Sequence, residues 1–316
     1  METKIRIGIS SCLLGNPVRW DGGHKRDRYL TDTLGQYVEW VPVCPEVEVG
    51  FGTPRETLRL VGDPDAPRLV TTKTGIDHTD RMTSWAAGRL KELEAEGLCG
   101  FIFKSDSPSS GMIRVKVYGK GGVPQKKGVG VFARAFMEHC PLIPVEDDGR
   151  LNDPGIRENF IDQVFTLKRW RESRSRKSCV GNVVDFHSRN KLLFMAHSPE
   201  LLRRMGKIAA AGKQMDCGAL YREYEQLMIK ALQLKPTVKK HTNALQHMMG
   251  YFKTDLTGDE KRELLEVITA YRKELTPLIV PVTLINHYVR KYDQPYLKSQ
   301  TYLNPHPLEL KLRNHV

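Results

Sequence analysis

The sequence has no hydrophobic run long enough to cross a membrane. Its most apolar stretch, residues 275–285, contains two prolines in eleven residues, whereas a transmembrane helix needs about 18 or more apolar residues. The first ten residues lack the apolar core of a signal peptide. Cysteine is also scarce, and the six cysteines are too widely spaced for a disulfide framework. These absences favour a reduced, cytoplasmic protein that does not enter a membrane.

The distribution of charge divides the chain into two parts. Residues 1–148 hold 20 Lys and Arg against 20 Asp and Glu, whereas residues 149–316 hold 29 against 17. This asymmetry predicts two domains, 1–148 and 149–316, with different partners. The basic second domain suits an anionic partner, nucleic acid first. A basic, solvated surface without a partner is the alternative.

The first domain alternates between strand patterns and helix patterns. Apolar residues recur at helical spacing over 81–96 and 128–139. Runs typical of β-strands lie at 4–10, 38–44, 99–104, 114–118 and 142–145. This alternation predicts an α/β domain with a mostly parallel sheet and helices on both faces.

Two cysteines and a serine-rich loop follow three of these strands. Cys12 comes two residues after the first strand, Cys44 ends the second, and the loop 105–111 follows the third. In open α/β sheets, ligands bind just beyond the carboxyl ends of the strands. The sequence therefore predicts a binding site at this edge of the sheet.

The segments at this edge are SSCLLGNPVRWDGGHK (10–25), VCPEVEVGFGTPRETLRLV (43–61) and FKSDSPSSGMIRVKVY (103–118). They resemble the three motifs of the thiouracil desulfurase family, which is domain-of-unknown-function family 523. Residues 150–316 resemble the YbgA-like family, domain-of-unknown-function family 1722. The whole chain is thus similar to a fusion of the two.

The resemblance implies iron–sulfur chemistry on a thiolated pyrimidine. Members of the desulfurase family hold a [4Fe–4S] cluster with three cysteines, and the open iron takes the sulfur of a thiolated uracil. The matching ligand positions here are Cys12, Cys44 and Ser110, and the matching catalytic positions are Glu46 and Ser107. Ser110 stands where the desulfurases have a cysteine. This departure matters because iron–sulfur clusters prefer soft thiolate ligands to hydroxyls.

Three interpretations of this edge remain open. In the first, two cysteines hold a cluster together with a serine or an outside ligand. In the second, the pocket binds a modified base without a cluster. In the third, Cys12 and Cys44 are buried structural residues. Glu46 is a candidate proton donor or acceptor. Its alternative role is a helix N-cap or a salt-bridge partner.

The second domain is expected to be all-α. Asp153 and Pro154 form a helix start, and Thr257 with Glu260 forms a capping box. A proline-rich tail, 302–312, is expected to lie on the surface.

Basic and amide side chains of this domain are candidates for nucleic-acid contacts. Lys240, Asn243 and His247 share one face if residues 237–253 are helical. Such a face can bind phosphates and bases. Trp170 beside Arg169 adds a candidate patch for stacking and charge. A solvated helix end is the alternative.

The sequence therefore supports two main functional hypotheses. The first is an iron–sulfur-dependent desulfurase that acts on a thiolated pyrimidine, free or within RNA. The second is a cluster-free protein that binds modified nucleobases or RNA through the basic helical domain. A scaffold that has lost its chemistry is a third.

Overall fold

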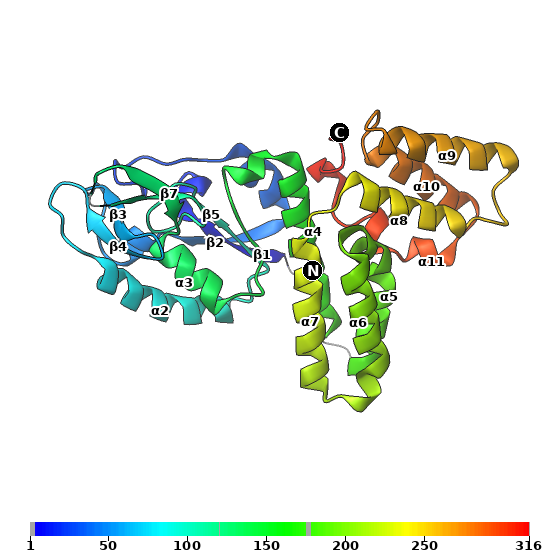
Figure 1. Cartoon of the computed structure of the whole chain (residues 1–316), viewed down its shortest axis with the longest axis horizontal. Coiled ribbons are helices and arrows are strands. Elements are labelled where there is room, and N and C mark those ends of the chain that lie inside the picture. Colours follow the sequence, from blue (N-terminus) through cyan, green and yellow to red (C-terminus); the bar gives the residue numbers. More distant parts are fainter. Residues whose placement is uncertain (1–3, 120, 175–177, 316) are drawn as a thin grey trace. The chain divides into compact units, whose positions relative to one another are not determined.

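The computed structural model describes residues 4–119, 121–174 and 178–315. Within it the chain divides into two compact units, Met1–Asp153 and Pro154–Val316 (Figure 1). The predicted fold class is confirmed, because the first unit is built on a parallel sheet with helices and the second consists mostly of helices.

A parallel sheet forms the centre of the first unit. Its strands are β1 (Ile5–Ser10), β2 (Val38–Val43), β5 (Gly100–Phe103) and β8 (Val145–Asp147). They lie in the order β2-β1-β5-β8, and every neighbouring pair is parallel. Because all four strands run in one direction, their carboxyl ends lie at one edge of the sheet.

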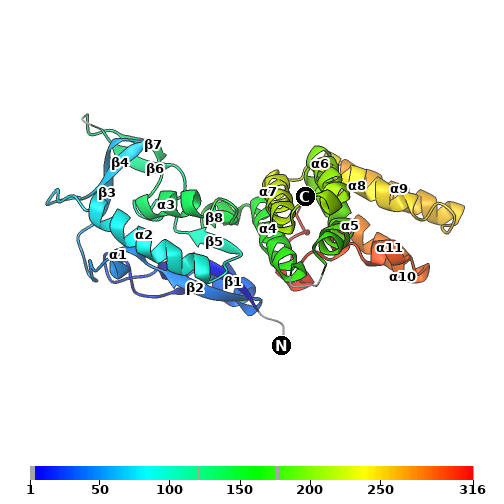
Figure 2. The same ribbon diagram turned by 90° about the horizontal axis from the view of Figure 1, so that it is seen from below.

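Two helices, α2 (Thr79–Ala95) and α3 (Val131–His139), cover one face of this sheet and lie side by side (Figure 2). Their buried side chains pack against Phe101 and Phe103 of β5. The packing is close: a Cβ atom added at Gly8 would lie 2.2 Å from the ring of Phe101. On β1, Ile7 and Ile9 alternate with Gly8 and are fully buried on the opposite face.

A second sheet was not predicted. It has the order β4-β3-β6-β7 and contains one parallel and two antiparallel pairs. Its strands are β3 (Leu58–Asp63), β4 (Ala66–Thr71), β6 (Val115–Tyr118) and β7 (Pro124–Gly128). Only β6 had a recognisable strand pattern. The sequence of β7 is PQKKG, and its first four residues are exposed, so no apolar alternation marks it as a strand.

The second unit begins at α4 and consists of helices and short turns. The helices are α4 (Pro154–Ser173), α5 (Cys179–His197), α6 (Pro199–Ala211), α7 (Cys217–Gln233), α8 (Val238–Gly250), α9 (Gly258–Arg272), α10 (Ile279–Lys291) and α11 (Pro295–Lys298). The expected capping box is present at Thr257 and Glu260. Among the described residues, no helix combines the length and apolar character that crossing a membrane requires.

The expectation of a surface tail is wrong. Tyr302 is fully buried, and Leu303, Leu310 and Leu312 are nearly so. The buried guanidinium of Arg313 also donates to the Tyr302 carbonyl oxygen at 2.6 Å. The prolines prevent a regular helix, but the apolar side chains between them still pack into the interior of the unit.

Two cysteines of the second unit are paired. Cys179 and Cys217, which begin α5 and α7, form a disulfide with a Cα–Cα distance of 6.0 Å. The other four cysteines lie in the first unit and form no disulfide.

Candidate active site at the carboxyl edge of the parallel sheet

The parallel sheet positions the three motifs together. β1 ends at Ser10, β2 at Val43 and β5 at Phe103, and these strands are neighbours in the sheet. Cys12, Cys44 and the loop that contains Ser110 therefore leave the sheet at the same edge.

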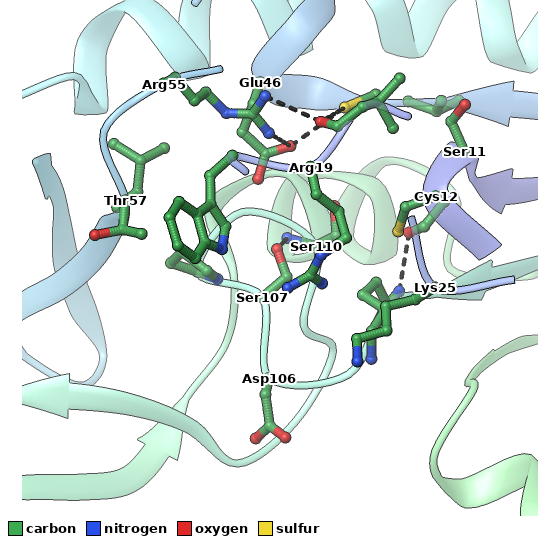
Figure 3. Close-up of a pocket in the computed structure, with 18 of the residues that line it drawn as sticks. Ser11, Cys12, Arg19, Lys25, Glu46, Arg55, Thr57, Asp106, Ser107 and Ser110 are labelled. Atoms are coloured by element: carbon green, nitrogen blue, oxygen red, sulfur yellow. Dashed lines mark hydrogen bonds and ion pairs between the residues drawn. The ribbon is translucent and has the colours of Figure 1, made fainter. Parts of the chain in front are cut away.

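They line a single cavity of about 380 Å³ (Figure 3). All five residues predicted for the active site are among those that line it: Cys12, Cys44, Glu46, Ser107 and Ser110. They come from segments up to about a hundred residues apart in sequence, so the cavity depends on the fold of the whole unit.

Glu46 lies at the centre of a hydrogen-bond network in this cavity. It belongs to α1 (Pro45–Glu48), which starts directly after β2. Its Oε1 accepts a hydrogen bond from the Ser109 hydroxyl at 2.5 Å, and its Oε2 accepts one from the Cys44 thiol at 3.6 Å. An Arg55 guanidinium nitrogen lies 3.9 Å from the same Oε2. The carboxylate therefore has two donors and one cation around it.

The loop of the third motif is held against α3. The N–H groups of Phe132 and Ala133, at the start of that helix, donate to the Ser109 carbonyl oxygen at 2.9 and 3.1 Å. This satisfies backbone donors that the helix leaves unpaired. The contact requires glycine at Gly130, where a Cβ atom would lie 2.5 Å from the Ser109 carbonyl group. Ser110 is thereby fixed, with its N–H donating to the Ser107 hydroxyl at 3.1 Å.

Both thiols of the cavity are protonated at neutral pH. Burial raises the pKa of Cys12 to about 11, an effect that the nearby Lys104 ammonium partly offsets. Burial also raises the pKa of Cys44 to about 12, and the Glu46 carboxylate adds to this shift. Neither residue is therefore a thiolate nucleophile by itself.

The sequence did not indicate three further residues of the site. Ser109 bonds Glu46, Arg55 faces the same carboxylate, and Lys104 pairs with Asp148 at 2.8 Å while lining the cavity. Ser109 lies inside the quoted third motif, but spacing alone does not show which of its serines turns toward Glu46.

The donor set does not fit a cluster held by three thiolates. Cys12 and Cys44 are the only cysteines among the described residues that line the cavity, and Ser110 offers a hydroxyl. Cys99 precedes β5 and so lies at the opposite end of that strand. Across the described part of the chain, no three His, Cys, Asp or Glu side chains are grouped to hold a metal ion.

The nucleic-acid candidates in the helical unit are not brought together as a patch. The prediction of a stacking surface at Trp170 is wrong: the indole is fully buried and stacks on Tyr224 at a centroid distance of 4.9 Å. Arg169 donates to the Pro305 carbonyl oxygen at 2.7 Å. Helix packing thus uses both residues inside the unit.

The predicted face of α8 is divided between two environments. Lys240 donates to the His197 carbonyl oxygen at 2.6 Å and so closes the end of α5. Asn243 and His247 remain exposed. A phosphate-binding role therefore stays a prediction for Asn243 and His247. Lys240 was the cation of this face, and its ammonium group already bonds a backbone carbonyl oxygen.

Comparison with known proteins agrees with the two-unit architecture. The first unit is an α/β domain with two thiols and a glutamate at the carboxyl edge of its parallel sheet, and the second is a basic helical domain. The family described as 2-thiouracil desulfurase matches residues 7–148, and the family of unknown function DUF1722 matches residues 191–307. The chain belongs to the 2-thiouracil desulfurase family through its first unit and to the DUF1722 family, with YbgA, through its second.

Each individual relative matches half of this chain or less. The uncharacterized protein YbgA of Escherichia coli (strain K12) is 31% identical over 158 residues, which are 50% of this chain and 94% of YbgA. The uncharacterized protein YbbK of Bacillus subtilis (strain 168) is 31% identical over 110 residues, 33% of this chain and 72% of YbbK. A solved [4Fe–4S]-dependent thiouracil desulfidase, TudS, aligns with a TM-score of 0.40 and 32% identity, covering 48% of this chain and 95% of its own. The resemblance inferred from the motifs is confirmed.

Proposed function

We propose that the first unit binds a thiolated pyrimidine in the cavity and removes its sulfur. One observation carries the proposal: the three motifs of the desulfurase family converge on one cavity that contains Glu46 and two thiols. A volume of about 380 Å³ suits a small heterocycle. Trp20 lines the same cavity and is 47% exposed, so its ring face is available to stack on a base.

The overall reaction is a hydrolysis. Water supplies an oxygen to the thiocarbonyl carbon, the carbon–sulfur bond breaks, and sulfur leaves as hydrogen sulfide with both protons of the water. The carbon keeps its oxidation state, so the reaction needs no oxidant or reductant. Glu46 takes a proton from the attacking water and delivers it to the departing sulfur. Ser109 and Arg55 hold the carboxylate in position for both transfers.

The family also implies a [4Fe–4S] cofactor, whose ligands here would be Cys12, Cys44 and Ser110. The third of these is a hydroxyl, which is a poor ligand for iron, and the proposed proton transfers need only the chain's own residues. Direct binding of the base without desulfurisation is the second candidate function, and the serine at 110 favours it.

Turnover and binding separate the two candidates. The full chain, purified without oxygen, is incubated with 2-thiouracil while the thiocarbonyl absorbance and released sulfide are measured. Equal loss of absorbance and gain of sulfide supports the desulfurase. Saturable binding by calorimetry with no sulfide supports the base-binding protein. Absence of both binding and turnover contradicts the assignment of the cavity to a thiolated pyrimidine.

A further inference from the structure

A second cavity lies in the helical unit, between α10, α11 and the C-terminal segment. Its volume is about 550 Å³. One stripe of α10 forms its wall, with Val282, Asn286 and Val289 at helical spacing. Leu303 and Leu308 of the C-terminal segment lie opposite.

The cavity has an apolar floor and an apolar rim. Val282 is 1% exposed, Val289 4% and Leu303 3%. Leu308, in contrast, is 64% exposed. The apolar surface that a flat ligand can cover is therefore that of Leu308, since the three buried side chains expose almost none.

Amides and cations surround this floor. Three carboxamides, Asn286, Asn304 and Asn314, line the cavity together with Arg290 and Lys298. The described residues that line it include no Asp or Glu. Arg290 is exposed and has no ion-pair partner among the described residues, whereas Lys298 lies 3.5 Å from Asp293. A carboxamide can both donate and accept at the edge of a heterocycle, and a guanidinium binds phosphate with two N–H groups.

Buried contacts anchor the C-terminal segment that faces α10. The Ile279 N–H at the start of α10 donates to the Arg313 carbonyl oxygen at 3.1 Å. The Arg313 side chain pairs with Glu158 of α4 at 3.4 Å and donates to the Tyr302 carbonyl oxygen. The segment that carries Asn304, Leu308 and Asn314 is thus anchored by buried side chains on both sides of the cavity, so a ligand does not have to order it.

We propose that this cavity binds a nucleotide, with the base against Leu308, the ring edge on the carboxamides and the phosphate on Arg290. The nucleotide is either free or part of a single-stranded RNA, since both carry the same groups. The site lies in a different unit from the proposed desulfurase cavity and does not depend on it.

Calorimetry on the full chain tests the proposal with four probes: uridine 5′-monophosphate, uridine, inorganic phosphate and a short oligouridylate. The monophosphate is expected to bind more tightly than uridine or phosphate. Arg290→Gln is expected to weaken it about tenfold, because a charge-assisted hydrogen bond is lost. Asn286→Ala is expected to reduce the preference for the monophosphate over phosphate.

One control locates the site. Arg272→Gln removes one exposed positive charge from α9 outside the cavity. It should not change the affinity for the monophosphate. If only the oligouridylate binds, with the same loss in Arg290→Gln, the nucleotide belongs to RNA. Equal affinity for phosphate and monophosphate, or unchanged affinity in Arg290→Gln, overturns the proposal.

Discussion

The two cavities of this chain are built by different means. The first lies where parallel strands end, and three short motifs enter it from neighbouring strands. The second is formed by one stripe of α10 and an irregular segment whose path is set by buried tail residues. The first cavity combines thiols with a glutamate, and the second combines amides with cations. A site at strand ends can be found from sequence spacing, whereas a site formed by a packed tail requires the tertiary structure.

The largest expected effect is on catalysis in the first cavity. Glu46→Gln keeps the shape and removes the proton acceptor, so the rate of sulfide release should fall by about 10²- to 10⁴-fold. Glu39→Gln, which replaces an exposed glutamate of β2 that pairs with Arg6, is the matched control and should keep full activity. An unchanged rate in Glu46→Gln would remove the carboxylate from the mechanism.

The two units should respond differently to the loss of a tryptophan. Trp170→Ala empties a fully buried position in the helical unit and should lower the free energy of unfolding by about 3–5 kcal/mol. Trp20→Ala, at a position that is 47% exposed, should change it by only about 0.5 kcal/mol or less. Denaturant unfolding measures both. Equal destabilisation by the two changes would contradict the burial difference.

The same contrast shows what sequence reasoning could reach. Cys12, Cys44 and the serine loop were predicted to lie together, because the carboxyl ends of parallel strands share one edge. The bond from Ser109 to Glu46 could not be predicted, since it depends on how the loop packs against α3. Trp170 was misassigned because an arginine-flanked tryptophan has the same local sequence whether it is packed inside the unit or exposed on its surface.

The second sheet and the buried tail were missed for a related reason. The residues of β7 are polar, and pairing with β6 alone makes the segment a strand. In the tail, Tyr302 and Leu310 are buried by long-range packing between prolines that suggested a surface segment. Both features come from contacts between distant residues, which hydropathy periodicity does not record.

Thiol chemistry provides a test of the first cavity that needs no substrate. Because the pKa of Cys12 is raised to about 11, only a small fraction is thiolate at pH 8. Its alkylation by iodoacetamide should be on the order of 10²-fold slower than that of an ordinary thiol. The rate should still rise about tenfold per pH unit up to pH 10. Peptide mapping by mass spectrometry measures the rate, with the denatured chain as control, and a plateau below pH 9 would contradict the raised pKa.

The replacement of one oxygen atom by sulfur at position 110 tests how this chain differs from the three-cysteine pattern of its family. Ser110→Cys places a third thiol at the position that follows β5 and lines the cavity. After anaerobic reconstitution with iron and sulfide, we expect fewer than one iron per chain in the unaltered protein and about four in Ser110→Cys. Metal and sulfide analysis with the visible absorption spectrum measures this. Ser84→Cys adds an exposed thiol on α2 outside the cavity and should bind no more iron than the unaltered protein.

The result bears directly on how the first cavity works. Iron is held by thiolates far more readily than by a serine hydroxyl, whose proton is much harder to remove. If the unaltered protein already holds four irons, Ser110 or an outside ligand completes the site, and the hydroxyl does not limit the cluster. Ser110→Cys could instead gain both four irons and a release of sulfide that the unaltered protein lacks. The natural chain is then a base-binding protein, and Ser110 is the single residue that prevents the desulfurase reaction.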